Sequence, residues 1–319
     1  MTLESTQDPR LASPDAGVRR IAILDIADAE DDDDLPTLIG ALRDDTAIEV
    51  RAEAARVLGG WGHPAAVDAL ANALLDTDPA VRANAATALG QLKDAGAGAR
   101  LLPWASHAEP SVRAAALRGL KELRIAAAAV PAQTSLTHDD AAVRREAVGV
   151  LGWLKSTEAL PAIARLATTD VDAEVRRTAT GALGLSSEEG HATVLPALLA
   201  ALRDASWPVR EEAATTLAKL VPPAALQALL AAMQDDAWQV RLRAARALGR
   251  LRDAAALPVL IEALAHPMGN LRKEAALALG EIGAVDAVPA LEVAAADPDP
   301  EVRKTARLAL SRLAQGGAT

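Results

Sequence analysis

The apolar positions of this chain recur in one phrase along almost its whole length. The phrase is an aliphatic residue followed by Arg, then Ala four positions after the aliphatic residue and Leu or Ile eight positions after it. Positions four apart lie on one side of a helix, so each copy predicts an amphipathic helix. The copies begin at Val18, Val50, Val81, Val112, Val143, Val175, Val209, Val240, Leu271 and Val302.

These starts are 31 to 34 residues apart, which is the signature of a stacked array of helical hairpins. A second apolar helix precedes most copies, and proline in its first turn is tolerated because the first-turn amides have no helical partner. We therefore predict an all-α fold without strands, a right-handed α-α superhelix of about ten hairpins. The prolines assigned to first turns are Pro36, Pro161, Pro196, Pro258 and Pro289.

The regularity of the phrase sets the expected domain limits. The repeat array should cover residues 17–314, with a tail or cap at 1–16 and a short tail at 315–319. The first copy lacks a convincing upstream helix, which is why residues 1–16 are assigned to a cap. The longest spacing inserts a polar loop at Ser186–Ala192, where the array should be least regular.

Composition narrows the classes of function. Half of the 319 residues are hydrophobic, but only 2% are aromatic and all of these are Trp, which fits closely packed helices with small side chains. The absence of Cys excludes disulfides, thiolate metal sites and a Cys nucleophile. A net charge of −10 disfavours nucleic acid and anionic membranes and weakly favours a basic partner. No apolar run of 18 residues is present, so we expect a soluble, cytoplasmic protein.

The Arg of each phrase has a candidate partner. The position five residues before each aliphatic residue, here called the turn column, holds Asp in six copies, so each Arg can bind a turn of its own or the adjacent repeat. His takes the place of Asp in three copies, where it can accept the same backbone hydrogen bond. These His lie in different repeats, and no metal site is expected. The turn-column residues are Asp45, Asp76, His107, His138, Asp170, Asp204, Asp235, His266 and Asp297.

The phrase resembles HEAT repeats, and more closely the short bacterial HEAT-like type found in phycobilin lyases. Asp78 to Arg82 and Val240 to Gly249 carry this resemblance. It implies a non-catalytic scaffold, adaptor or assembly chaperone that binds another protein. The alternative that it implies is a lyase or chaperone for a bilin or other tetrapyrrole chromophore. No catalytic residue and no cofactor are nominated, and an enzyme is the less favoured interpretation.

Two tryptophans mark a candidate binding edge. Trp207 and Trp238 each fall two residues before the aliphatic position, the predicted exposed first residue of the helix, in consecutive repeats. Exposed Trp is enriched at binding hot spots, although each ring could instead lie flat on its own turn. Trp61, by contrast, falls at a position that is Leu in other copies and is assigned to the core. The edge continues along one helix with Arg241, Arg243, Arg246 and Arg250, which could alternatively pair with acidic residues of neighbouring repeats.

A second candidate is a shallow groove over the fifth and sixth copies. Gly149 and Gly181 leave out side chains on the outer helix face, and Glu146 and Trp153 lie near Gly149 in the sequence. A glycine inside a helix costs about 0.5–1 kcal/mol, so two at one register suggest the close approach of another group.

Overall fold

The structure is a computed structural model that describes residues 8–29, 31–94, 96–187 and 190–316. Within these ranges the chain is built from α-helices and short 3-10 helices, and no strand occurs. The predicted all-α solenoid fold is confirmed. No helix in the same ranges is long and apolar enough to cross a membrane. The chain divides into two compact units, residues 1–156 and 157–319, which are described one at a time.

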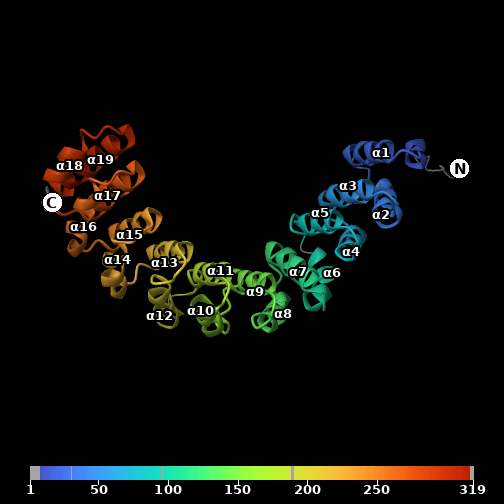
Figure 1. Ribbon diagram of the computed structural model, residues 1–319, viewed down its shortest axis with the longest axis horizontal. Helices are drawn as coiled ribbons and strands as arrows, with labels where there is room; N and C mark the ends of the chain where they lie inside the picture. The colour runs from blue at the N-terminus through green and yellow to red at the C-terminus, as the bar shows by residue number, and fades with distance from the viewer. Residues whose placement is uncertain (1–7, 30, 95, 188–189, 317–319) are drawn as a thin grey trace. The chain divides into compact units, whose positions relative to one another are not determined.

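The first unit consists of two layers of helices, coloured blue to green in Figure 1. In one layer each helix packs against the next that carries the phrase: α1 (Ala16–Ala29), α3 (Ile48–Val57), α5 (Pro79–Leu89), α7 (Pro110–Glu122) and α9 (Ala141–Trp153). The other layer contains α2 (Leu35–Asp44), α4 (Pro64–Ala73), α6 (Ala97–Leu101) with the 3-10 helix η4 (Leu102–Ser106), and α8 (Ala129–Ser135).

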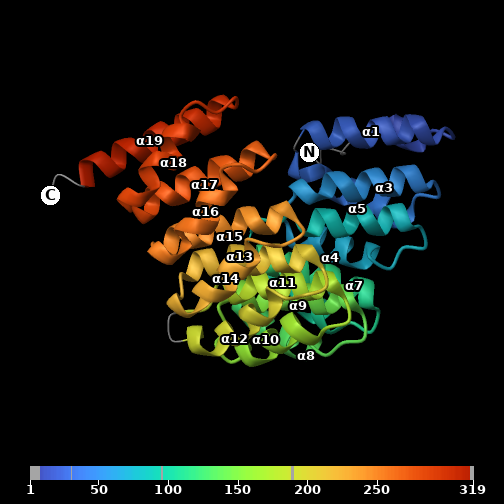
Figure 2. The same cartoon turned by 60° about the vertical axis from the view of Figure 1, so that its left-hand side comes forward.

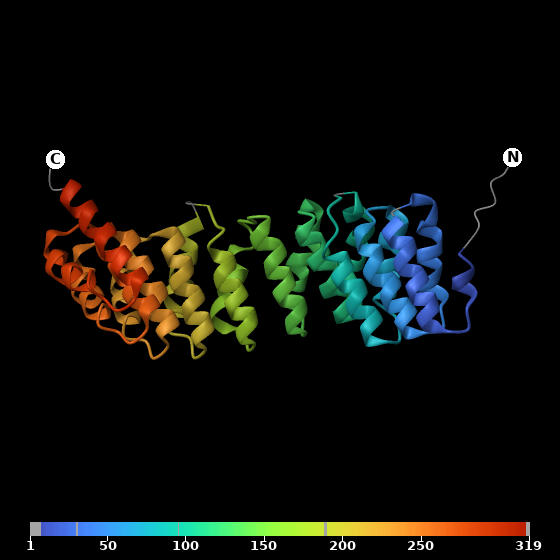
Figure 3. The same ribbon diagram turned by 90° about the horizontal axis from the view of Figure 1, so that it is seen from above.

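The second unit repeats this plan, with the phrase helices again side by side (Figures 2 and 3). They are α11 (Ala173–Leu183), α13 (Trp207–Leu220), α15 (Trp238–Leu251), α17 (Gly269–Ile282) and α19 (Pro300–Gly316). Each has a partner helix that completes the hairpin: α10 (Leu160–Thr169), α12 (His191–Ala201), α14 (Leu226–Ala232), α16 (Leu257–Ala263) and α18 (Val288–Ala294). In the first unit, by contrast, α1 is preceded by the short 3-10 helix η1 (Pro9–Ala12) in place of a partner α-helix.

The Ala of the phrase lies at the centre of the packing. In all ten copies, from Ala22 to Ala306, it is completely buried. Where Leu is followed by Gly at the end of the phrase, neighbouring helices come closer still. A Cβ added to Gly249 or Gly280 would lie 2.7 Å from Ala278 or Ala309 of the next phrase helix. Small residues at these points therefore set the distance between repeats.

Two local expectations are wrong. Pro196 lies inside α12 instead of in its first turn, because this helix already begins at His191. Trp61 is partly exposed, because α3 ends at Val57 and a 3-10 turn shifts the register before Trp61. The outer parts of the two predicted tails, residues 1–7 and 317–319, lie outside the described residues, as do Glu188 and Glu189 of the polar insert.

The buried Ala predicts a sharp sensitivity to side-chain size. Ala85→Leu should lower the free energy of unfolding by about 1–3 kcal/mol, because the added carbons have no space between packed helices. Ala83→Leu, at an exposed position of the same helix, should change it by less than about 0.5 kcal/mol. Urea unfolding followed by circular dichroism measures both. Equal effects of the two substitutions would contradict the packing role of Ala85.

Candidate functional site

The turn edge, formed by the turn column and the first residues of the phrase helices, carries a series of ion pairs between repeats. The Nε and Nη2 groups of the phrase Arg donate to the two carboxylate oxygens of the turn-column Asp in the next repeat, at 2.6–3.0 Å. The predicted contact is confirmed at these positions. Such pairs join Arg19 to Asp45, Arg51 to Asp76, Arg176 to Asp204, Arg210 to Asp235 and Arg272 to Asp297.

Each of these guanidinium groups also binds its own repeat. Nη1 of Arg51, for example, donates to the carbonyl oxygen of Asp45 at 3.0 Å. The turn-column carboxylate in turn accepts the backbone N–H two residues later, as Asp76 does from Asp78 at 2.8 Å. One Arg therefore ties the turn of its own repeat to the turn of the next. Both side chains of the Arg51–Asp76 pair are about 13% exposed, so the pair is shielded from solvent more than a surface ion pair.

The ion pairs shift the protonation of their carboxylates. The hydrogen bonds from Arg51 and Arg19 lower the pKa of Asp76 and Asp45 below the usual value, although burial acts in the opposite direction. The hydrogen bond from Arg272 does the same for the pKa of Asp297. These three carboxylates are therefore ionised at neutral pH.

The series is interrupted where His occupies the turn column. His107, His138 and His266 each accept the backbone N–H two residues later through Nδ1, at 3.0 Å, in the manner of Asp. This confirms the predicted role of His in the turn, but no carboxylate is supplied to the Arg of the preceding repeat. The Arg residues that precede these three positions are Arg82, Arg113 and Arg241, and none forms an ion pair in the described part of the chain.

Trp207 and Trp238 occupy equivalent places at this edge. Each is the first residue of its helix, and the two helices, α13 and α15, pack side by side. The side chain of Trp207 is 41% exposed, as predicted, whereas Trp238 is covered to a greater extent. The structure therefore presents two Trp at one register of consecutive repeats, with the first more accessible than the second.

The four Arg predicted to extend this edge do not form one patch. A helix turns by about 100° per residue, so Arg241 lies close to Trp238 around α15, three residues away. Arg243, Arg246 and Arg250 share a different side of the helix. There, Nε of Arg243 lies 3.1 Å from Glu211, and Nη1 of Arg250 donates to the carbonyl oxygen of Ala218 at 2.9 Å, both on α13.

Arg246 reaches in the other direction and binds Glu274 on α17 at 2.7 Å and 3.0 Å. The Glu274 side chain is only 8% exposed, so Arg246 compensates a buried negative charge. These three Arg are engaged between neighbouring phrase helices, as the alternative interpretation of the sequence proposed. A part in partner binding stays a prediction for them, and Arg241 is the member of the set that lies at the turn edge.

The residues of the second candidate, the groove, are divided between the two units: Gly149 lies in the first and Gly181 in the second. In the first unit, Glu146 is buried and binds Arg118 at 2.8 Å, and Lys121 occupies the space beside Gly149, within 3.2 Å of an added Cβ. In the second unit, Glu212 fills the space beside Gly181 in the same way, at 2.9 Å. Side chains of adjacent helices thus occupy the room that both glycines leave, and ligand binding there stays a prediction.

Two aromatic contacts were missed at the sequence level. The guanidinium carbon of Arg124 lies 4.9 Å from the centre of the Trp153 ring, a cation–π contact. Arg124 follows the end of α7 and has a φ of 57°, in the left-handed region. Arg is not a residue type that predicts this conformation, so the sequence did not indicate the contact. The rings of Trp104 and His107 are stacked with their centres 5.7 Å apart; their spacing of three residues in a helical turn was an available signal.

Comparison with known proteins identifies the repeat. The family model for HEAT repeats matches in tandem at residues 35–105, 98–184, 169–241 and 229–311. A search of curated proteins found no match to this chain.

Solved structures share the fold. An engineered protein is 24% identical, with a TM-score of 0.53, and the match covers 95% of this chain and 97% of that one. Kap95p from a complex with RanGDP is 15% identical (TM-score 0.64, covering 95% and 49%), and importin β is 17% identical (TM-score 0.62, covering 96% and 50%). This chain spans about half the length of Kap95p and importin β.

The ion pairs of the turn edge predict how stability depends on pH. Because the folded-state pKa of Asp76 is lowered, the unfolded chain takes up its proton first as the pH falls. The stabilisation is therefore complete above the ordinary pKa of about 3.9 and is lost as the pH falls below it. Asp76→Asn and Arg51→Gln should each make the unfolding free energy depend less steeply on pH between about 5 and 3, as measured by urea titration. An unchanged slope in both variants would refute this linkage.

The Arg246–Glu274 pair predicts a structural cost at a candidate binding residue. Arg246→Ala should lower the free energy of unfolding by about 1–3 kcal/mol, because it leaves the buried Glu274 carboxylate without its partner. Replacing both residues, as Arg246→Ala with Glu274→Leu, should recover most of this loss. Arg243→Ala, whose pair is more exposed, should cost less than about 1 kcal/mol. If Arg246→Ala is as mild as Arg243→Ala, Glu274 does not depend on its partner.

Proposed function

We propose that this chain, which belongs to the HEAT-repeat family, is a non-catalytic scaffold, adaptor or assembly chaperone that binds another protein through the turn edge of its second unit. The observation that carries the proposal is the pair Trp207 and Trp238, at one register of two helices that pack side by side. Trp is enriched at the centres of protein interfaces because one ring contributes a large apolar area.

The surroundings of the two rings support an interface. The first residue of a helix packs little into the core, and the Trp207 side chain is 41% exposed, so its large ring contributes little to folding. Arg241 adds a charged group three residues from Trp238. An apolar anchor beside a guanidinium is a common arrangement at binding hot spots.

The fold is compatible with this function. Structures of the same fold include Kap95p in complexes with RanGDP and with Nup1, so a HEAT-repeat chain is able to hold a second protein. Hairpins that bury their apolar faces against each other leave a row of turns and helix faces available for binding. The proposal takes from these structures only the type of function, since their sequences are 15–16% identical to this chain.

The proposal predicts that Trp207→Ala combined with Trp238→Ala weakens partner binding by roughly 2 kcal/mol or more. Circular dichroism and the melting temperature should stay nearly unchanged. The partner would be captured from native lysate with the immobilised full chain and identified by mass spectrometry, and its affinity for each variant would then be measured. Leu75→Ala, which removes an exposed large apolar side chain from the first unit, is the matched control and should bind the partner normally.

Two other outcomes would redirect the proposal. If the double variant loses helicity while its folded fraction binds normally, the two rings serve the fold and the docking surface lies elsewhere. Addition of a bilin to the wild-type chain tests the tetrapyrrole alternative, and a saturable change in visible absorbance would favour it over the scaffold function.

A further inference from the structure

The turn edge of the second unit contains a guanidinium that lacks the carboxylate found at equivalent positions. On one side of it, Asp235 is bound by Arg210; on the other, Asp297 is bound by Arg272. Between them, Nε of Arg241 is buried and has no hydrogen-bond partner. Leaving a buried donor unsatisfied costs about 1–3 kcal/mol, so an acceptor supplied from within the chain would stabilise the protein here. A partner from outside can reach only the terminal nitrogens of this guanidinium.

Arg241 lacks a carboxylate partner because one residue of the next repeat differs. The next repeat places His266 in the turn column, and its Nδ1 accepts the N–H of Met268 at 3.0 Å, which preserves the turn. Burial, together with the charges of Arg241 and Arg272, lowers the pKa of His266 below its usual value. His266 is therefore neutral at pH 7, and it does not balance the charge of Arg241.

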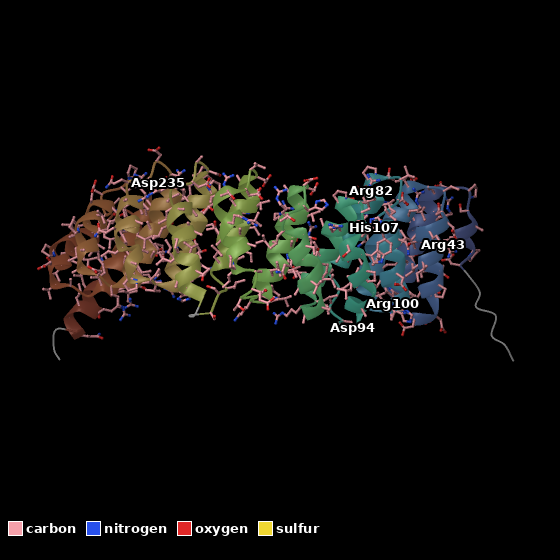
Figure 4. All side chains as sticks on the ribbon, turned by 90° about the horizontal axis from the view of Figure 1, so that it is seen from below. Arg43, Arg82, Asp94, Arg100, His107 and Asp235 are labelled. Atoms are coloured by element: carbon pink, nitrogen blue, oxygen red, sulfur yellow. The ribbon has the colours of Figure 1, made fainter. Side chains whose placement is uncertain are left out.

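The acid of the same repeat is already engaged. Asp235, labelled in Figure 4, receives hydrogen bonds at 2.6 Å and 2.8 Å from Arg210 and one at 2.9 Å from the N–H of Ala237. Burial alone would raise the pKa of Asp235, but these hydrogen bonds and, to a smaller extent, the nearby positive charge of Arg241 lower it. Arg241 forms no ion pair with Asp235. Arg241 is partly exposed, and its Nη1 and Nη2, which unlike Nε are not buried, form no hydrogen bond within the described part of the chain.

We propose that the two terminal nitrogens of Arg241, Nη1 and Nη2, bind a carboxylate of the partner protein, because His266 stands where other repeats supply an Asp. The inference rests on the proposed docking at Trp207 and Trp238 and adds its chemistry: the partner presents an Asp, a Glu or a chain terminus beside an apolar group. The intact pairs show that an Arg at this edge can hold a carboxylate with two of its nitrogens, as Arg272 holds Asp297 at 2.7 Å and 2.8 Å. Bidentate pairs of this kind are among the strongest hydrogen bonds in proteins.

The first unit offers a matched comparison. Arg82 is likewise followed by a His in the turn column, His107, and both are labelled in Figure 4. Here Nη1 of Arg82 donates to the carbonyl oxygens of Asp76 and Thr77 at 2.7 Å and 2.9 Å. The same substitution, His→Asp, can therefore be made in each unit, once beside the proposed docking edge and once away from it.

The test restores the missing acid within the chain. In His266→Asp the new carboxylate should pair with Arg241, as Asp297 pairs with Arg272, and exclude the carboxylate of the partner. We expect the affinity for the partner to fall at least about tenfold, with an unchanged or higher melting temperature. His107→Asp should leave the affinity unchanged. If His266→Asp binds the partner as tightly as the wild type, the proposal is overturned.

A direct readout does not require the partner. The probe is a blocked tetraglutamate peptide added at constant ionic strength to the full chain, with the tetraglutamine peptide as the neutral control. The Nε–H resonance of Arg241, identified by its loss in Arg241→Lys, should shift in a saturable way with tetraglutamate only, and should not respond in His266→Asp. A shift no larger than that of Arg210 would overturn the proposal.

The two sets of variants separate this inference from the proposed function. If the Trp207→Ala and Trp238→Ala variant loses the partner while His266→Asp keeps it, the docking edge is supported and the carboxylate is overturned. If tetraglutamate shifts Arg241 while the Trp variant keeps the partner, the anion site is supported and the docking edge is overturned.

Discussion

The contact between successive phrase helices at the buried Ala is the constraint on which the other features depend. A hairpin of two short helices cannot cover its own apolar face, so it is stable only against a neighbour. The alanines allow the helices to approach closely, and at Gly249 and Gly280 the approach leaves no room even for a methyl group. This spacing brings the turn of one repeat within reach of a guanidinium from the previous one.

The ion pairs of the turn edge are a consequence of that spacing. An Arg at a fixed place in each phrase helix meets the carboxylate of the next turn, and the same Arg holds the carbonyl groups of its own turn. The pairs repeat because the distance between repeats does. Where His replaces Asp, as at His266, the turn is retained and the ion pair is lost. Because the other pairs are regular, the one Arg of the second unit that faces a His, Arg241, can be recognised as lacking a carboxylate.

The interactions that stabilise the repeats also decide which surface residues are available to a partner. Arg243 and Arg246 look alike in the sequence and are both basic residues of one helix, but each already holds an acidic group of a neighbouring helix. Trp207 has no comparable task in the core. Exposed aromatic rings and an unsatisfied guanidinium are therefore better guides to the binding edge than the number of positive charges.

The sequence alone determined the repeat, its period, the all-α fold and the matching positions of Arg and Asp, while the structure decided which repeat each Arg binds. These properties depend on spacing along one helix and on a relation that recurs in every copy, as the burial of Ala85 illustrates. It did not determine which charged side chains remain available to bind a partner. Glu274 and Arg246 are 28 residues apart, and only the packing of α15 against α17 makes them partners. The partial covering of Trp238, the shifted register of Trp61 and the unsatisfied Nε of Arg241 likewise depend on where neighbouring helices end, and this is set by tertiary packing and not by the residues themselves.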